Sequence, residues 1–260
     1  MAADLTQYGQ VMRDILYPPV IGFAKTAFKL LDLTIQMSGI ENVPRTGGAV
    51  LAVNHISYVD FVIGGFGTQP SKRLVRFMAK EVLFRNRWSG PLMRGMHHIP
   101  VDRGAGAGSY REAIRYLGEG EIVGVFPEAT ISRSFELKEF KSGAVRMAAE
   151  AGVPVIPMVL WGTQRMMTKD HPRDFSRHQT VAITVGEPLT VNPDDDPAKA
   201  TARLRTTMTG MLDRTIRAYL EQPAGVWWLP AAYGGGAPTP TEAEKLDQEE
   251  LRRRASRPKK

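Results

Sequence analysis

The sequence contains no cysteine, and this absence removes several kinds of chemistry at once. Disulfide bonds, zinc–cysteine sites and a cysteine nucleophile are all excluded. The chain also lacks a run of about 18 uninterrupted apolar residues, so it predicts no transmembrane helix. Its first residues are polar and lack the basic-then-apolar order of a secretory signal, which we therefore do not expect. The absence of cysteine fits a protein of a reducing compartment.

Acidic residues are too few to balance the basic ones, and the surplus is unevenly spread. The formal net charge is +7, with a sequence pI of about 9.7. Within residues 71–103, eight basic residues face two acidic ones, which gives this stretch a charge of +6. A field of that sign attracts phosphate esters, nucleic acid or an acidic membrane. The positive charge is the only feature of the sequence that favours a nucleic-acid partner, and charge by itself is insufficient. We therefore expect no nucleic-acid partner.

Residues 7–37 have a helical pattern that is interrupted by Pro18 and Pro19. In the second piece, four polar residues recur at helical spacing on one narrow stripe, while large apolar residues cover the rest. These polar residues are Lys25, Lys29, Asp32 and Gln36. The pattern predicts that residues 1–38 are amphipathic helices that either pack on the core or dock on a membrane.

Strand and helix patterns alternate along residues 39–233. This alternation predicts a single layered α/β domain with a mixed, largely parallel sheet flanked by helices. Apolar runs place strands at 49–53 and within 73–84, 97–103, 121–126, 153–162 and 180–189. A long amphipathic helix with an acidic, proline-containing start is predicted after residue 194.

The composition changes near the end of the chain. Trp227, Trp228 and Tyr233 are expected to anchor on the core or at a membrane surface. Residues 234–260 are poor in apolar residues and rich in glycine, proline and charge, so they predict a disordered basic tail. Its last residues either attract anionic lipid or only aid solubility.

The stretch "NHISYVD" places His55 directly after the predicted strand 49–53, with Asp60 five positions later. The carboxyl end of a strand in an open α/β sheet is where ligands bind. A helix beginning near Ser57 would let Asp60 fold back to the imidazole. A carboxylate on one ring nitrogen fixes the tautomer and leaves the other nitrogen free to accept a proton. The pattern predicts a general base.

A nucleophile to accompany this base is missing from the chain. Ser57 lies too close in sequence, and no G-x-S-x-G elbow occurs. The reacting hydroxyl is therefore expected to come from a substrate. H-E-x-x-H is absent, the adjacent His97 and His98 are a poor metal pair, and "GAGAGSY" does not complete a phosphate loop. We predict no metal and no bound cofactor.

Four blocks in order resemble the glycerolipid acyltransferase family, the family of 1-acylglycerol-3-phosphate acyltransferases. "NHISYVD" resembles its N-H-x-S-x-x-D block, with the H-x4-D pair. "HIPVDR" resembles the second block, "VFPEATIS" the F-P-E-G-T-R-S block, and "VPVIPMVL" the fourth. Together the blocks span residues 54–160.

The resemblance implies a role for each matching residue. His55 is similar to the general base, Asp60 to its orienting partner, and Arg103 to the phosphate-binding arginine. The third block implies acceptor binding by Glu128, Ala129, Thr130, Ser132 and, by extension, Arg133.

This chain departs from the third block at two positions. Ala129 and Ile131 stand where the family has glycine and arginine. Arg133 is the candidate to replace the missing guanidinium. Backbone N–H groups after His55 or in the 128–130 loop are candidates to stabilise an oxyanion, and the sequence does not choose between them.

The resemblance implies a reaction of phospholipid biosynthesis. A fatty acyl group passes from acyl-CoA to the free hydroxyl of 1-acylglycerol-3-phosphate and gives phosphatidic acid. Another lysophospholipid or a glycolipid is the alternative acceptor. A non-catalytic membrane or lipid-binding module is the alternative of another class. We expect a peripheral protein at the cytoplasmic face of the cell membrane, on an anionic surface.

Overall fold

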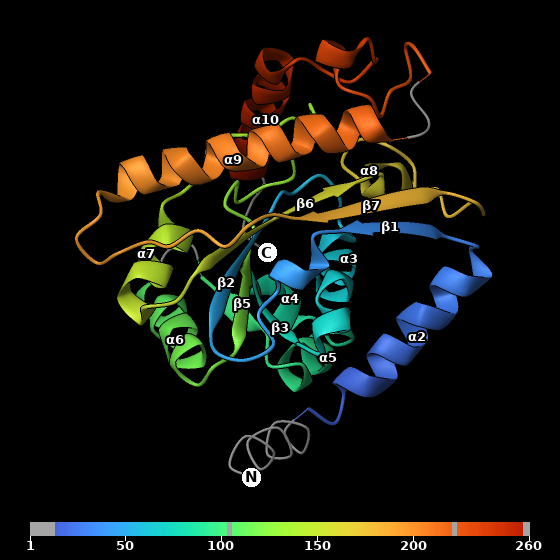
Figure 1. The fold of residues 1–260 in the computed structure, drawn as a ribbon. Helices are drawn as coiled ribbons and strands as arrows, with labels where there is room; N and C mark the ends of the chain where they lie inside the picture. The colour runs from blue at the N-terminus through green and yellow to red at the C-terminus, as the bar shows by residue number, and fades with distance from the viewer. Residues whose placement is uncertain (1–13, 103–105, 220–222, 257–260) are drawn as a thin grey trace.

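The computed structural model describes residues 14–102, 106–219 and 223–256, which build a seven-stranded sheet (Figure 1). The strands lie in the order β1-β7-β6-β2-β5-β3-β4, and all neighbours are parallel except β6 and β7. This confirms the predicted α/β fold. The strands are β1 (Thr34–Ser38), β2 (Ala49–Val53), β3 (Val75–Lys80), β4 (Ile99–Val101), β5 (Ile122–Val125), β6 (Val155–Trp161) and β7 (Thr180–Val185).

Helices cover both faces of the sheet (Figure 1). One face carries α6, α7 and α9, and the other carries α3. The helices are α2 (Tyr17–Leu30), α3 (Asp60–Gly67), α4 (Val82–Arg85), α5 (Ser89–Gly95), α6 (Ala107–Gly118), α7 (Gly143–Ala151), α8 (Thr163–Met166), α9 (Pro197–Ala218) and α10 (Pro240–Ala255). Short 3₁₀ turns are η1 (Ile40–Asn42), η2 (Gln69–Ser71) and η3 (Ala231–Tyr233).

The central strands are apolar along their whole length because both faces of the sheet are covered. Every residue of β2, β5 and β6 is buried. The predicted long helix is α9, and its start is fixed by Asp196, whose side chain accepts a hydrogen bond from the backbone N–H of Ala198. The core thereby holds the carboxyl ends of β2, β5 and β6 in fixed positions.

The N-terminal segment differs from the predicted pair of helices. Helix α2 ends at Leu30, Asp32 adopts a positive φ of 49°, and β1 follows. Residues 34–38 pair with β7 along their whole length and extend the sheet, although the polar residues of this segment have helical spacing. The predicted boundary at residue 38 is therefore wrong, since the sheet already includes residues 34–38.

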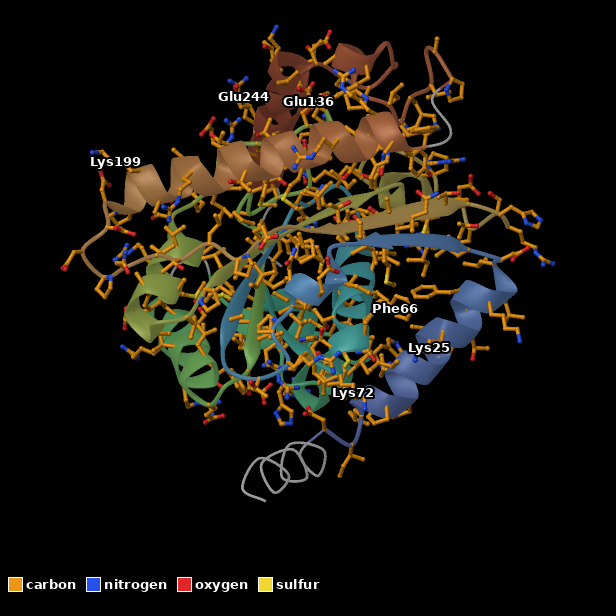
Figure 2. The ribbon with its side chains drawn as sticks, viewed as in Figure 1. Lys25, Phe66, Lys72, Glu136, Lys199 and Glu244 are labelled. Carbon is orange, nitrogen blue, oxygen red and sulfur yellow. The ribbon has the colours of Figure 1, made fainter. Side chains whose placement is uncertain are left out.

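Helix α2 contacts the rest of the protein through few side chains, among them Tyr17, whose hydroxyl donates to the Val75 carbonyl, and Phe28. Phe28 packs edge-on against Phe66 of α3, with ring centroids 5.3 Å apart, and Phe66 faces α2 in Figure 2. No residue of α2 is buried, and the side chains of Phe23 and Leu30 are 77% and 70% exposed. An apolar surface therefore remains uncovered on this helix.

Among the described residues, no helix has both the length and the apolar character that crossing a membrane requires.

The prediction of a disordered tail from residue 234 is wrong for most of its length. Residues 240–255 form α10, which is dark red in Figure 1. Thr239 and Glu242 form a capping box at its start, with Pro240 in the first turn. Before it, Trp228 is buried in the core, and Tyr219 packs edge-on against it.

Two of the basic residues between 71 and 103 are structural. The Arg73 guanidinium donates hydrogen bonds to three backbone carbonyls, those of Pro44, Gly47 and Gly120. Arg76 is buried and pairs with Asp14 and Glu121. The positive charge that this stretch presents to a ligand is therefore smaller than its formal charge of +6.

Candidate active site

The predicted catalytic residues lie at the carboxyl edge of three neighbouring strands, β6, β2 and β5. Asn54 follows β2 and is fully buried, and its side-chain amide exchanges two hydrogen bonds with the backbone of Leu160 in β6. This link fixes the point at which the chain leaves the sheet. The backbone at His55 is therefore anchored to the end of β2.

His55 and Asp60 form the predicted pair. The imidazole Nδ1 lies 3.0 Å from the Asp60 carboxylate Oδ2. Asp60 is the first residue of α3 and has no exposed surface, whereas the side chain of His55 is 20% exposed. No described residue forms a hydrogen bond with Nε2. The structure therefore joins one ring nitrogen to a buried carboxylate and leaves the other facing outward.

Asp60 is held by three further donors. Its Oδ2 accepts the backbone N–H groups of Ile56 and Ser57, each at 2.7 Å, and its Oδ1 accepts the Thr163 hydroxyl at 2.7 Å. Because Asp60 Oδ2 accepts hydrogen bonds from the donors around it, Nδ1 of a neutral imidazole donates to it and Nε2 is left as the acceptor. The N–H groups of Ile56 and Ser57 are thereby committed to Asp60 and are not oxyanion donors.

Aromatic rings support the other side of the imidazole. Phe126 stacks on His55 with ring centroids 4.1 Å apart, and Phe77 stacks on Phe126 at 5.6 Å. Gly124 leaves room for this stack, since a Cβ there would lie 2.5 Å from the Phe77 ring. Thr163 and Phe126 are site residues that the sequence reasoning missed. Phe126 opens the F-P-E block, whereas Thr163 carries no motif.

Glu128 supports the backbone of the site. Its two carboxylate oxygens accept the N–H of His55 at 2.8 Å and the N–H of Lys138 at 3.0 Å. Burial raises the pKa of Glu128 to about 7, against the opposing effect of these two N–H groups. Glu128 is buried, and both of its carboxylate oxygens hold the backbone of the site.

The rest of the third block divides into surface and interior. Ala129 is exposed and Thr130 half-buried, whereas Ile131 and Ser132 are buried. The Ser132 N–H donates to the His55 carbonyl at 2.7 Å, and its hydroxyl donates to the Glu136 carbonyl. Ile131, at the position of the family's arginine, packs inside the protein.

Arg133, the expected replacement, lies in a cluster of charges. Its guanidinium pairs with Asp170 and with Asp247 and Glu250 of α10. Lys169 binds the same two α10 carboxylates, and Lys138 binds Asp247. The three cations Arg133, Lys138 and Lys169 together form the Arg133 cluster. Arg103 lies outside the described residues.

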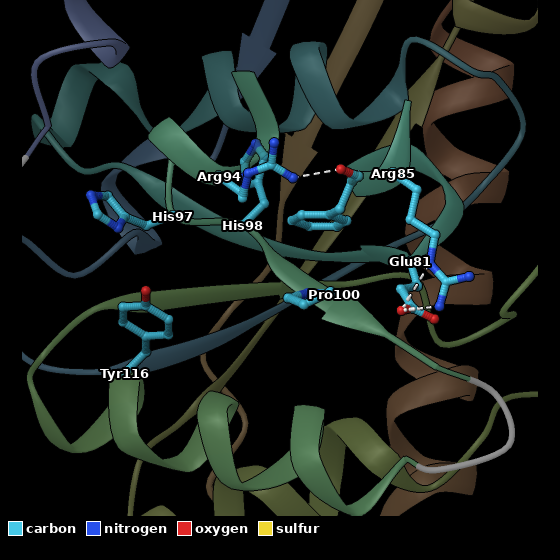
Figure 3. Close-up of a pocket in the computed structure, with 8 residues that line it drawn as sticks. Glu81, Arg85, Arg94, His97, His98, Pro100 and Tyr116 are labelled. Carbon is cyan, nitrogen blue, oxygen red and sulfur yellow. Dashed lines mark hydrogen bonds and ion pairs between the residues drawn. The ribbon is translucent and has the colours of Figure 1, made fainter. Parts of the chain in front are cut away.

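A pocket beside β4 has a lining that includes neither His55 nor Asp60 (Figure 3). Arg94 and Arg85 at its edge are engaged, respectively, by the Phe84 carbonyl and by Glu81. His98 in its wall accepts the N–H of Phe77, and burial lowers the pKa of His98 to about 4. This histidine is neutral and structural. Among the described residues, no cluster of three metal-binding side chains occurs.

The chain is similar to known acyltransferases over its central part. A family model described as acyltransferase matches residues 34–161. The 1-acyl-sn-glycerol-3-phosphate acyltransferase of Bacillus subtilis is 35% identical over 60% of this chain and 73% of its own length. A probable enzyme of the same name from Mycoplasma pneumoniae is 32% identical over 58% of this chain and 60% of its own length.

The fold also has a solved counterpart. The crystal structure of the 1-acyl-sn-glycerophosphate acyltransferase PlsC from Thermotoga maritima is similar with a TM-score of 0.66. It covers 79% of this chain and 81% of that chain at 23% sequence identity, which supports the fold alone. These comparisons confirm the family that the four sequence blocks indicated.

Proposed function

The chain belongs to the acyltransferase family, and we propose that it transfers a fatty acyl group from acyl-CoA to the free hydroxyl of 1-acylglycerol-3-phosphate, with His55 as general base. The product is phosphatidic acid, and acyl-CoA enters as a co-substrate. The observation that supports this most is the bond between His55 Nδ1 and a buried Asp60, which leaves Nε2 as the outward-facing acceptor.

In the proposed step, His55 accounts for both proton transfers. Nε2 of His55 removes the proton of the acceptor hydroxyl while that oxygen attacks the thioester carbonyl. The carbon–sulfur bond breaks, and the imidazolium returns the proton to the leaving thiolate. Asp60 stays ionised and stabilises the imidazolium. A positioned base of this kind contributes about 10²–10⁴-fold to a rate.

One observation keeps another lysophospholipid or a glycolipid as the second candidate acceptor. Ile131 is buried at the position where the family has arginine, so this chain lacks that phosphate ligand. Recognition of a phosphate then depends on Arg103 and on the Arg133 cluster. An acceptor without a phosphate monoester would not need either of them.

The substrates are lipids, and we propose that the protein binds peripherally to the cytoplasmic face of the cell membrane. Phe23 of α2 and Trp88 near α5 are 77% and 78% exposed, and Arg85 and Arg87 are exposed beside Trp88. Burial of a large apolar side chain is worth about 1.5–3 kcal/mol. Phe23→Ser and Trp88→Ser are expected to reduce co-sedimentation with phosphatidylglycerol vesicles. Unchanged co-sedimentation would place the membrane contact elsewhere.

The absence of cysteine makes a direct assay possible. Purified protein is mixed with oleoyl-CoA and lysophosphatidate, and free thiol is followed with a thiol-reactive dye, to which the protein adds no background. We expect acceptor-dependent thiol release that is lost in His55→Ala. His178→Ala is the matched control, because His178 also pairs with an aspartate, Asp32, at 3.0 Å but is exposed.

The outcomes separate the candidates. Release with lysophosphatidylcholine or a glycolipid, and none with lysophosphatidate, would establish the second candidate acceptor. Absence of release with every donor and acceptor, in protein that binds vesicles, would refute acyl transfer and favour the non-catalytic lipid-binding module. Equal loss in His55→Ala and His178→Ala would refute the assignment of the base.

A further inference from the structure

The contact between α10 and the Arg133 cluster is made mainly by charges. The inward stripe of α10 consists of Ala243, Leu246, Asp247 and Glu250, and of these only Ala243 is buried. Leu251 is 61% exposed, and Glu244 projects from the outer side of the helix (Figure 2). A helix that buries so little apolar surface gains little from the hydrophobic effect. Its two inward carboxylates therefore carry much of its attachment.

These carboxylates are arranged as one polyanionic group. Glu250 Oε2 lies 2.9 Å from Arg133 Nη2 and 3.0 Å from Lys169 Nζ. The two oxygens of Asp247 bind Arg133 and Lys169 on one side and Lys138 on the other. Three carboxylate oxygens thus face three cations, and a phosphate monoester also presents three oxygens.

The charge balance also matches a phosphate monoester. With α10 in place, the three cations are neutralised by Asp170, Asp247 and Glu250. Without the two α10 carboxylates, the site keeps a net charge of +2. A phosphate monoester carries about −1.5 to −2 at neutral pH. The guanidinium of Arg133, whose side chain is only 7% exposed, is a planar donor suited to such a ligand.

The cluster is joined to the catalytic residues by short links. Lys138 and His55 donate their backbone N–H groups to the same Glu128 carboxylate. Ser132, next to Arg133, donates to the His55 carbonyl. The Met167 carbonyl, near Lys169, accepts the Ser57 hydroxyl at 2.6 Å. The phosphate and the free hydroxyl of 1-acylglycerol-3-phosphate lie on neighbouring carbons, so its phosphate must bind close to the base.

We propose that the Arg133 cluster is the binding site for the acceptor's phosphate monoester, and that α10 occupies it with Asp247 and Glu250 until the acceptor displaces the helix. This inference rests on the proposed acyl transfer. Helix α10 acts as an internal competitor whose release is coupled to acceptor binding. The apparent affinity for the acceptor is reduced in proportion to the fraction of molecules in which α10 is docked.

Hydrogen exchange of the full chain tests the displacement without requiring turnover. Exchange in residues 240–255 is compared without additions and with lysophosphatidate, with monoacylglycerol of the same acyl chain, with inorganic phosphate, and with phosphatidylglycerol vesicles. We expect lysophosphatidate to raise exchange in this segment at least about fivefold, inorganic phosphate to do so only at much higher concentration, and the other two to leave it unchanged.

Other patterns would overturn the proposal. Unchanged exchange with lysophosphatidate would show that α10 is a fixed structural element. An equal rise with phosphatidylglycerol vesicles would show that the cluster docks on a membrane, and an equal rise with monoacylglycerol would show that the phosphate is irrelevant. Equal effects of lysophosphatidate and inorganic phosphate at one concentration would make it a general phosphate site.

Kinetics supply an independent test. In Asp247→Asn/Glu250→Gln the competitor is weakened, so we expect KM for lysophosphatidate to fall about 5–10-fold with kcat unchanged. Glu244→Gln/Glu249→Gln removes the same charge from the exposed side of α10 and is expected to leave KM unchanged. An equal change in both variants, or none in either, would overturn the proposal. If lysophosphatidate displaces α10 but the protein shows no turnover, only the proposed acyl transfer is refuted.

Discussion

The two ends of the candidate site are held together in different ways. His55 and Asp60 are five residues apart, and Asp60 is fixed by two backbone N–H groups and one hydroxyl in the interior. Arg133 and its α10 partners are more than a hundred residues apart and join only through charged side chains. The Asp60 bonds are buried, whereas the α10 ion pairs are partly exposed, and the proposed displacement exchanges them for the phosphate of the acceptor.

This contrast assigns separate tasks to the two regions. A base must keep one tautomer and one orientation through every turnover, and the Asp60 network provides that. An acceptor must enter and the product must leave, and a site closed by exchangeable ion pairs permits both. Changes at Asp60 should therefore alter kcat, and changes on α10 should alter KM.

The largest expected effect comes from Asp60→Asn. The amide no longer stabilises the imidazolium, and it is expected to lower kcat by about 10²–10⁴-fold with little change in KM. Thiol release at saturating lysophosphatidate measures it. Asp32→Asn is the control, since Asp32 pairs with an exposed histidine and should have no effect. A large change in KM at Asp60→Asn would show that the two regions are not separable.

Glu128 connects the two regions. Its titration is expected to have an intermediate effect, on the free energy of unfolding. Burial raises the pKa of Glu128 from 4.5 to about 7, so between these pH values the folded protein holds a proton that the unfolded chain has lost. The free energy of unfolding therefore falls as pH rises across this window, by an amount of order 1–3 kcal/mol, and is flat outside it.

Urea unfolding of the wild type and of Glu128→Gln at pH 5, 6, 7 and 8 measures this slope. The variant cannot titrate at this position, so the difference between the two proteins isolates Glu128. We expect wild type to lose stability relative to the variant as pH rises from 5 to 7. A difference that does not change with pH would show that the carboxylate is ionised throughout.

The smallest expected effect is at Ala129, in the loop between the two regions. Ala129 has a φ of 60°, a conformation that glycine adopts more readily, and the family has glycine there. Ala129→Gly is expected to raise the free energy of unfolding by about 1 kcal/mol. Ala202→Gly on the exposed side of α9 should instead lower it by about as much. A loss of stability at both positions would show that the loop gains nothing from glycine.

The local part of the site could be predicted from sequence. His55 and Asp60 are close in the chain, and the strand before them is marked by its apolar run. Thr163 lies in α8, far along the chain, and meets Asp60 only because β6 lies beside β2. Local pattern carries no information on such a contact.

The two fold errors have the same origin. Thr34–Ser38 reads as the end of a helix until the edge of β7 offers it backbone partners. Residues 240–255 have the composition of a disordered tail, although the T-P-T-E start is a capping signal. The charges that would keep this segment solvated find partners in the Arg133 cluster. In both cases distant residues decided the structure against the local composition.

Steady-state thiol release with varied lysophosphatidate, run side by side on wild type, Asp60→Asn and Asp247→Asn/Glu250→Gln, tests the central claim most directly. The account predicts that the first variant lowers kcat at nearly constant KM and that the second lowers KM at constant kcat. The same parameter changing in both variants, or absence of acceptor-dependent release in the wild type, would contradict it.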